Sequence, residues 1–292
     1  MGRSITIDKV FKGPKLVNAG EGQDGSTSSG AREDAVMEAD FRAQGLEEIP
    51  IMTVMKDLKR LHLDDNELKT LPDEIGSLTC LVQLTAKGNG ILKLPSSLGK
   101  LRRLRLLDLS MNELKSLPSS MRKQTALRHL LLRNNVLETI ERKPKQTEES
   151  HEGAGEGSSS MDVSTSTCVI PVSVEFLDLQ VNCLQSLPDS FGILQKLTVL
   201  RLAKNQLSHL PESFGNLTAL EELDLSSNTV EDLPPSFSNL VKLRCEFCSA
   251  VIVLSISLLF FSSSFLLFLF SFYLLLRCFY FFFIFLRGSL TT

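Results

Sequence analysis

Large apolar residues recur along this chain with a period of 23 positions. The segment from Leu104 to Ala126 carries the complete pattern, LxxLxLxxNxLxxLPxxφ, in which φ is a large apolar residue. Full copies of this unit begin at Leu58, Leu81, Leu104, Leu127, Val174, Leu197 and Leu220. Self-similarity at a fixed spacing is the signature of stacked structural repeats, so the sequence predicts a repeat array.

The spacing inside one unit predicts the path of each coil. Leu107 and Leu109 are two residues apart, which places both side chains on one face of a short strand. Asn112 then turns the chain, and Leu117 and Met121 return toward the same interior along a partly helical arc. One coil cannot bury its own apolar face, whereas stacked coils cover one another. The predicted fold is an α/β solenoid with a curved parallel β-sheet on its concave face and short helical or irregular convex segments.

Two further columns of residues follow from the same repeat. A buried asparagine is costly unless its amide is hydrogen-bonded, and a stacked column of asparagines can satisfy the backbone groups of adjoining coils. The predicted structural ladder is Asn66, Asn89, Asn112, Asn135, Asn182, Asn205 and Asn228. A Leu-Pro pair follows in six of the seven units, and its proline fixes φ where the convex segment begins.

Composition divides the rest of the chain into further segments. The front is rich in Gly, Ser and acidic residues, and a similar stretch interrupts the array after the fourth unit. The predicted organisation is a disordered tether (1–36), a degraded N-terminal capping repeat (37–57), repeats 1–4 (58–141), a disordered insertion (142–172), repeats 5–7 with the start of an eighth (173–243) and a hydrophobic tail (244–292).

The N-terminal residues match a lipidation pattern. Gly2 and Thr6 fit MGxxx[ST], which is typical of N-myristoylation, and nearby lysines could supply the electrostatic second signal that a single acyl chain needs. The pattern is short, and the alternative is a plain exposed terminus.

The tail has two interpretations. Residues 247–276 contain no charged side chain and are long enough to span a bilayer, which predicts a single-pass segment at about 250–276. However, the eighth unit breaks within its strand, because Glu246 stands where Leu is expected and Val251 where Asn is expected. The tail consists largely of residues with thymine-rich codons. This favours the alternative that it is the translation of a retained intron.

Charge and cysteine content limit the classes of function. The net charge of -3 and the absence of a basic stripe along the sequence argue against nucleic acid as a partner. Six irregularly spaced cysteines, with no apolar signal sequence after Met1, predict a cytoplasmic protein. The four histidines occupy unrelated positions, and Cys245 and Cys248 form a lone CxxC. The sequence therefore predicts no enzyme, no metal site and no cofactor.

Side chains that alternate with the core leucines should face the concave solvent side. In the middle coils these positions hold apolar residues beside basic ones, which is typical of a docking surface. The predicted partner-binding residues are Leu106, His129, Leu131, Arg133, Phe176 and Arg201. The alternative is that these residues are scattered over an ordinary surface.

The 23-residue unit, with variants such as LPDSFG and LPSSLG, resembles the intracellular leucine-rich-repeat proteins of the Ras group, including their plant members. The resemblance covers roughly residues 41–243. It implies a non-enzymatic interaction scaffold in signalling, with a small GTPase or its effector as the protein partner. The alternative is a membrane-tethered, receptor-like leucine-rich-repeat protein anchored by the tail.

Sequencing of transcripts across the codon of Arg244 separates the two interpretations of the tail. If the tail is intron-derived, a spliced transcript will resume the repeat with Leu at position 246. Uniform absence of such a transcript would contradict the intron hypothesis.

Overall fold

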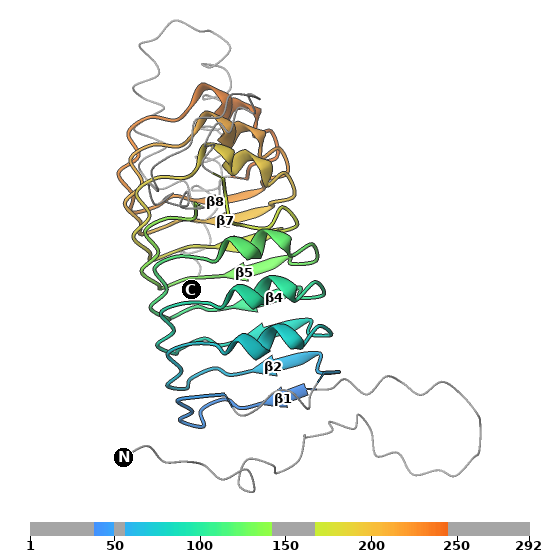
Figure 1. The fold of residues 1–292 in the computed structure, drawn as a ribbon. Helices are drawn as coiled ribbons and strands as arrows, with labels where there is room; N and C mark the ends of the chain where they lie inside the picture. The colour runs from blue at the N-terminus through green and yellow to red at the C-terminus, as the bar shows by residue number, and fades with distance from the viewer. Residues whose placement is uncertain (1–37, 50–55, 142–166, 245–292) are drawn as a thin grey trace, which may run out of the picture.

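The computed structural model describes residues 38–49, 56–141 and 167–244. These residues form a stack of similar coils, each resting on the one before it (Figure 1). The predicted tether and Gly2, most of the predicted insertion and the predicted span at about 250–276 lie outside the described residues.

One face of the stack is a single sheet of eight parallel strands in sequence order. The strands are β1 (Glu38–Asp40), β2 (Arg60–His62), β3 (Gln83–Thr85), β4 (Leu106–Asp108), β5 (His129–Leu131), β6 (Phe176–Asp178), β7 (Val199–Arg201) and β8 (Glu222–Asp224). Equivalent residues pair throughout, so that Leu107 lies beside Leu130 and Leu130 beside Leu177. This register confirms the predicted parallel sheet.

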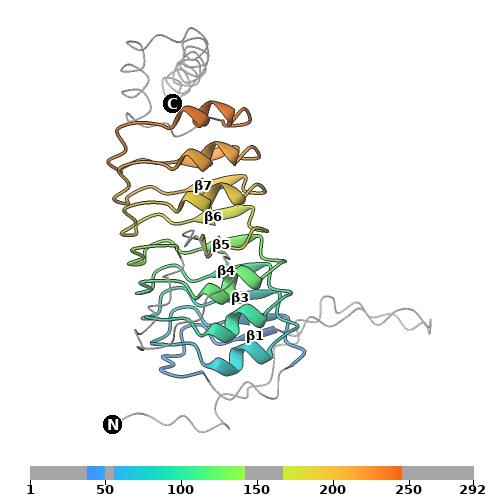
Figure 2. The same ribbon diagram turned by 45° about the horizontal axis from the view of Figure 1, so that its top comes forward.

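The other face carries short 3-10 helices, which lie one above another (Figure 2). They are η2 (Asp73–Ser77), η3 (Ser96–Lys100), η4 (Ser119–Lys123), η5 (Asp189–Ile193), η6 (Glu212–Asn216) and η7 (Pro235–Asn239). A proline of a Leu-Pro pair precedes each helix with φ between -63° and -70°, which suits the first turn. Phe191, Phe214 and Phe237 stack in the last three helices, with successive ring centroids 6.0 Å apart.

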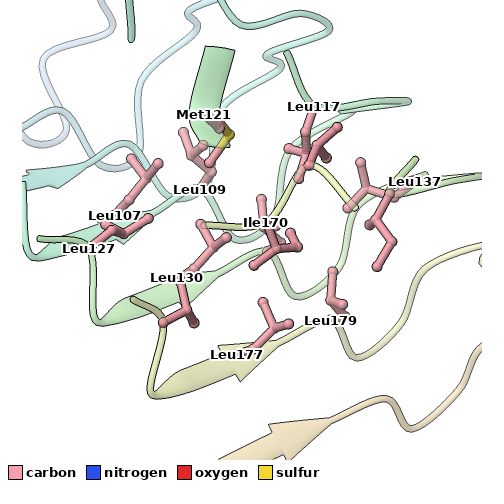
Figure 3. Close-up of a cluster of buried hydrophobic side chains, with 14 of the residues drawn as sticks. Leu107, Leu109, Leu117, Met121, Leu127, Leu130, Leu137, Ile170, Leu177 and Leu179 are labelled. Atoms are coloured by element: carbon pink, nitrogen blue, oxygen red, sulfur yellow. The ribbon is translucent and has the colours of Figure 1, made fainter. Parts of the chain in front are cut away.

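The core is one continuous cluster of leucines between the sheet and the helices. The central residue of each strand from β2 to β7 is fully buried, and Figure 3 shows Leu107, Leu130 and Leu177 stacked in the middle of the array. Each coil thus covers the apolar face of its neighbour, as the repeat pattern predicts.

The fourth coil closes differently from the others. Glu141 stands where the other units have proline, and no 3-10 helix is described between η4 and η5. Instead, Val169 and Ile170 are 1% exposed, and Ile170 lies among the core leucines in Figure 3. Ser173 Oγ donates a hydrogen bond to the carbonyl of Leu127 at 2.8 Å. The sequence analysis assigned residues 168–171 to the insertion, but they are buried and close coil four, because they carry the missing apolar side chains.

A left-handed backbone residue precedes every asparagine of the ladder. Asp65, Gly88, Met111, Asn134, Val181, Lys204 and Ser227 have φ between 55° and 67°. Only Gly88 adopts this region without strain from a Cβ atom. The tight turn into each asparagine is therefore maintained against local strain by the interactions that follow it.

Each asparagine joins its own coil to the preceding one. Asn182 Nδ2 donates hydrogen bonds to the carbonyls of Leu179 in its own coil and Leu132 in the preceding coil, both at 3.0 Å. Its Oδ1 accepts the N–H of Leu137 in the preceding coil at 3.0 Å. The other six asparagines make the equivalent three bonds. One side chain thus satisfies three backbone groups that the turn leaves unpaired.

We expect Asn182→Ala to lower the free energy of unfolding by about 1 to 3 kcal/mol, because it leaves the buried Leu137 N–H without a partner and removes one of the two asparagine hydrogen bonds that each of the Leu132 and Leu179 carbonyls accepts. Chemical denaturation measures this loss. The control is Asn216→Ala, which removes an exposed asparagine of η6 and should change stability by less than about 0.5 kcal/mol. Equal effects of the two substitutions would contradict the structural role of the ladder.

Candidate functional site

The middle of the concave sheet brings together the side chains on which the predicted site depends. In β4 to β7 the central leucine of each strand points into the core, and the residues on both sides of it point outward. Leu106, His129, Phe176 and Val199 therefore form one row, while Asp108, Leu131, Asp178 and Arg201 form the next. Together with Arg133, the residues of these two rows form what we call the concave patch.

Apolar side chains in the concave patch are half-buried rather than fully exposed. Leu106, Leu131, Phe176 and Val199 all have this intermediate exposure, whereas the sequence analysis placed them on the open solvent side. Parallel strands lie about 4.8 Å apart, so equivalent side chains on neighbouring coils cover one another. The patch therefore combines partly covered apolar side chains with polar ones, since His129 lies between Leu106 and Phe176, and Asp108 and Asp178 flank Leu131.

Phe176 lies at the centre of the concave patch. Its ring centroid is 6.0 Å from that of His129, and the Arg201 guanidinium carbon lies 5.2 Å from the Phe176 centroid. The Arg201 contact is a cation-π interaction, which holds the guanidinium against the ring while leaving its N–H groups available. Phe176 thus contacts two of the other predicted partner-binding residues, His129 and Arg201.

Two arginines flank this apolar surface without ionic partners. Among the described residues, neither Arg133 nor Arg201 forms a salt bridge or a side-chain hydrogen bond. Arg133 is exposed and lies two residues after the end of β5, while Arg201 ends β7. Guanidinium groups bind carboxylates in a bidentate manner, so both side chains can receive an acidic group from a partner.

Asp178 lies between these arginines and was not among the predicted site residues. It is only 4% exposed, and its Oδ1 accepts the backbone N–H of Gln180 at 3.0 Å. Burial raises the pKa of Asp178, while Gln180, Arg201 and Arg133 act in the opposite direction. Asp108 and Asp224 make the same turn at equivalent positions, and this recurring aspartate was the available sequence signal.

A shallow hollow of about 290 Å³ borders the patch on its C-terminal side. Its polar lining comes from Gln180, Arg201, Glu222, Asp224 and Arg244. Gln180 Nε2 donates to Asp224 Oδ2 at 3.0 Å and so crosses the intervening coil. Arg201 belongs to the concave patch and also lines this polar hollow, so its side chain borders both surfaces.

The remaining histidines and cysteines have other surroundings. His62 lies 3.3 Å from a Glu38 oxygen and 3.0 Å from Thr85 Oγ1, and these contacts join β1, β2 and β3. His209 contacts Ser208, while His151 and the Cys245–Cys248 pair lie outside the described residues. Across the described part of the chain, no cluster of three or more His, Cys, Asp and Glu side chains could hold a metal ion.

No helix within residues 38–49, 56–141 and 167–244 has the length and apolar character needed to cross a bilayer.

Comparisons with known proteins agree with the repeat geometry. Residues 195–244 match the family model described as Leucine rich repeat, and residues 57–78 match a second, described as Leucine Rich Repeat. Neither description names an enzyme. No curated protein sequence matches the chain.

Three solved structures have a similar fold. A leucine-rich-repeat protein of Leptospira interrogans, LIC12759, is 26% identical with a TM-score of 0.47, over 71% of this chain and 59% of that one. The plant peptide hormone receptor RGFR1, solved in complex with RGF2, is 26% identical with a TM-score of 0.49, over 65% of this chain and 31% of that one. The ectodomain of the receptor kinase GASSHO1/SCHENGEN3 from Arabidopsis thaliana, in complex with CASPARIAN STRIP INTEGRITY FACTOR 2, is 25% identical with a TM-score of 0.44, over 64% and 23%.

This chain spans less than two thirds of each of these three proteins. The coil geometry, the single parallel sheet and the two matched segments together define the fold as a leucine-rich-repeat solenoid. Domains of this class generally present their concave surface to protein partners.

Replacement of Asp178 by asparagine tests the electrostatics of the patch. Because burial raises its pKa, folded Asp178 retains a proton at pH values where the unfolded chain has lost it, so stability falls as pH rises through that window. We expect Asp178→Asn, which keeps the acceptor for Gln180, to be more stable than the parent at pH 7. The difference should vanish below the ordinary aspartate pKa of about 3.9.

Thermal unfolding between pH 3 and pH 8 checks this expectation. Asp108→Asn is the control, because Asp108 makes the equivalent turn to Ser110 from a more exposed position. A parent that is more stable than Asp178→Asn at neutral pH would contradict the assigned direction.

Proposed function

We propose that the chain is a non-enzymatic scaffold that binds a protein partner on the concave patch. The observation that carries this proposal is that four half-buried apolar side chains lie on adjacent strands beside two arginines without ionic partners. These apolar residues are Leu106, Leu131, Phe176 and Val199. Apolar and aromatic anchors beside arginine are the usual composition of a binding hot spot.

The chemistry of the patch favours an acidic segment of the partner. An apolar side chain of the partner would cover Phe176 and Leu131, and a neighbouring carboxylate would bind Arg133 or Arg201. Arg133 and Arg201 repel a basic side chain of the partner, so the patch also selects against basic segments. The hollow beside Arg201 has room for a further polar side chain of the partner.

The cellular setting of this proposal comes from the resemblance to the Ras-group proteins. It places the scaffold in the cytoplasm, in signalling, with a small GTPase or its effector as the partner. The membrane-tethered, receptor-like alternative depends on the uncharged run at about 250–276, whose origin the transcript experiment decides.

Selection from a random peptide library displayed on phage tests the proposed docking chemistry. We expect peptides retained by the full chain to combine an aromatic or aliphatic residue with a nearby Asp or Glu. The double variant Arg133→Glu/Arg201→Glu should bind these peptides about 10- to 100-fold more weakly and should instead retain peptides containing Lys or Arg.

The matched control is Lys69→Glu/Lys115→Glu, which reverses two exposed lysines away from the sheet and should keep the parental preference. Thermal unfolding of each variant verifies that the fold is intact. If the arginine variant retains the same peptides as the parent, the concave patch is not the docking site. Binding of purified Ras-type GTPases in the GTP-bound and GDP-bound forms then tests the partner class.

A further inference from the structure

Positive charge in this chain is concentrated in the second and third coils. Residues 92–128 contain nine lysines and arginines but only two acidic residues, which gives this segment a net charge of +7. The net charge of -3 for the whole chain conceals this concentration, because acidic residues in other segments offset it.

Most of these cations lie along one edge of the solenoid, where each coil passes from its 3-10 helix into the following strand. We call this the helix-to-strand edge. Lys100, Arg102 and Lys123 surround a single shallow hollow, whose only acidic side chain is Asp73. The exposed cations of the helix-to-strand edge are Lys100, Arg102, Arg103, Arg105, Arg122 and Lys123.

Acidic residues do not neutralise this edge. Glu175 and Glu221 lie along it in later coils, and each is already paired, with Arg128 at 3.2 Å and with Arg244 at 3.8 Å. Within the described part of the chain, none of the six exposed cations forms an ion pair. At the opposite edge, by contrast, Lys69 and Lys115 are interleaved with glutamates.

Exposed apolar side chains continue the same edge toward the C-terminus. Val172 and Val241 occupy the repeat position of Arg102 and are 49% and 74% exposed. Ile193 occupies the position of Lys100 and is 52% exposed. Three of the six most exposed large apolar residues in the described structure therefore lie on the same edge as the cations, in later coils.

We propose that the helix-to-strand edge docks on an anionic lipid surface. The cations attract acidic headgroups, and Val172, Ile193 and Val241 enter the boundary between headgroups and acyl chains. Basic residues beside exposed apolar ones on one side of a protein are the composition of an interfacial membrane-binding surface. The matching pattern at Gly2 and the uncharged run of the tail belong to the same chain, and a basic surface supplies the electrostatic signal that a single lipid anchor requires.

Other polyanions fit this edge less well. Proteins that bind single-stranded nucleic acids stack bases on aromatic side chains, and residues 92–128 contain no Phe, Tyr or Trp. A protein partner would require a compact apolar anchor at the centre of the charges, whereas the exposed apolar residues here lie beyond the cations in later coils. A lipid surface is extended and accommodates cations and apolar residues that follow one another along a line.

Fluorescence provides the first test, because the chain contains no tryptophan. In the full chain, Ile193→Trp places a single reporter on the helix-to-strand edge, and Leu92→Trp places one at an exposed apolar position on the opposite edge. With vesicles of phosphatidylcholine and phosphatidylserine, we expect a blue shift and quenching by brominated lipids for Ile193→Trp only. Insertion through the tail alone would leave both reporters unchanged, and that result would overturn the proposal.

Charge removal provides the second test. In the full chain, Arg102→Gln/Arg103→Gln/Lys123→Gln should weaken vesicle sedimentation with phosphatidylserine by roughly 100-fold and reduce its salt dependence, since each cation near an acidic leaflet contributes about fivefold. The matched control, Lys69→Gln/Lys93→Gln/Lys115→Gln, removes equal charge from the opposite edge and should bind as the parent does. Equal losses in both variants, equal binding to pure phosphatidylcholine, or tighter binding to RNA than to vesicles would each overturn the proposal.

Discussion

The hydrogen bonds of the asparagine ladder are the constraint on which the rest of the solenoid depends. Strands of three residues offer few backbone hydrogen bonds, and the turn after each strand leaves further groups unpaired. Each asparagine amide supplies those partners and simultaneously joins its coil to the preceding one. The same bonds hold a left-handed residue before each asparagine and fix the register of the whole array, so that equivalent side chains lie beside one another.

Periodicity allowed much of this fold to be predicted from the sequence, because a side chain's position in the repeat determines whether it faces the core. The left-handed residues were not predictable from composition, since only Gly88 is a glycine and the others are forced by the ladder. Residues 168–171 were assigned to the insertion because their apolar side chains follow no repeat spacing. In the candidate site, the rows of the sheet followed from spacing, but the burial of Asp178 and the contact of Arg201 with Phe176 depend on neighbouring coils.

Two surfaces with different chemistry result from one register. The concave patch combines half-buried apolar side chains with two arginines, and the helix-to-strand edge combines six exposed cations with three exposed apolar residues. The edge and the sheet face in different directions, since the edge residues lie before the strands and the patch residues lie on them. A solenoid that rests on its edge leaves its sheet open to a second macromolecule, so the two proposed interactions are sterically compatible.

The unusual closure of coil four divides the array into blocks with different interiors. Helices η2 to η4 bury Ile75, Leu98 and Met121, while η5 to η7 bury the phenylalanine stack. Between the two blocks, residues 168–173 take the place of a 3-10 helix. The repeat pattern then resumes at Val174, after its largest interruption. In a one-dimensional array, cooperativity depends on coupling between nearest neighbours. This junction is consequently where thermal melting can separate into two transitions, so that one block retains its structure after the other has been lost.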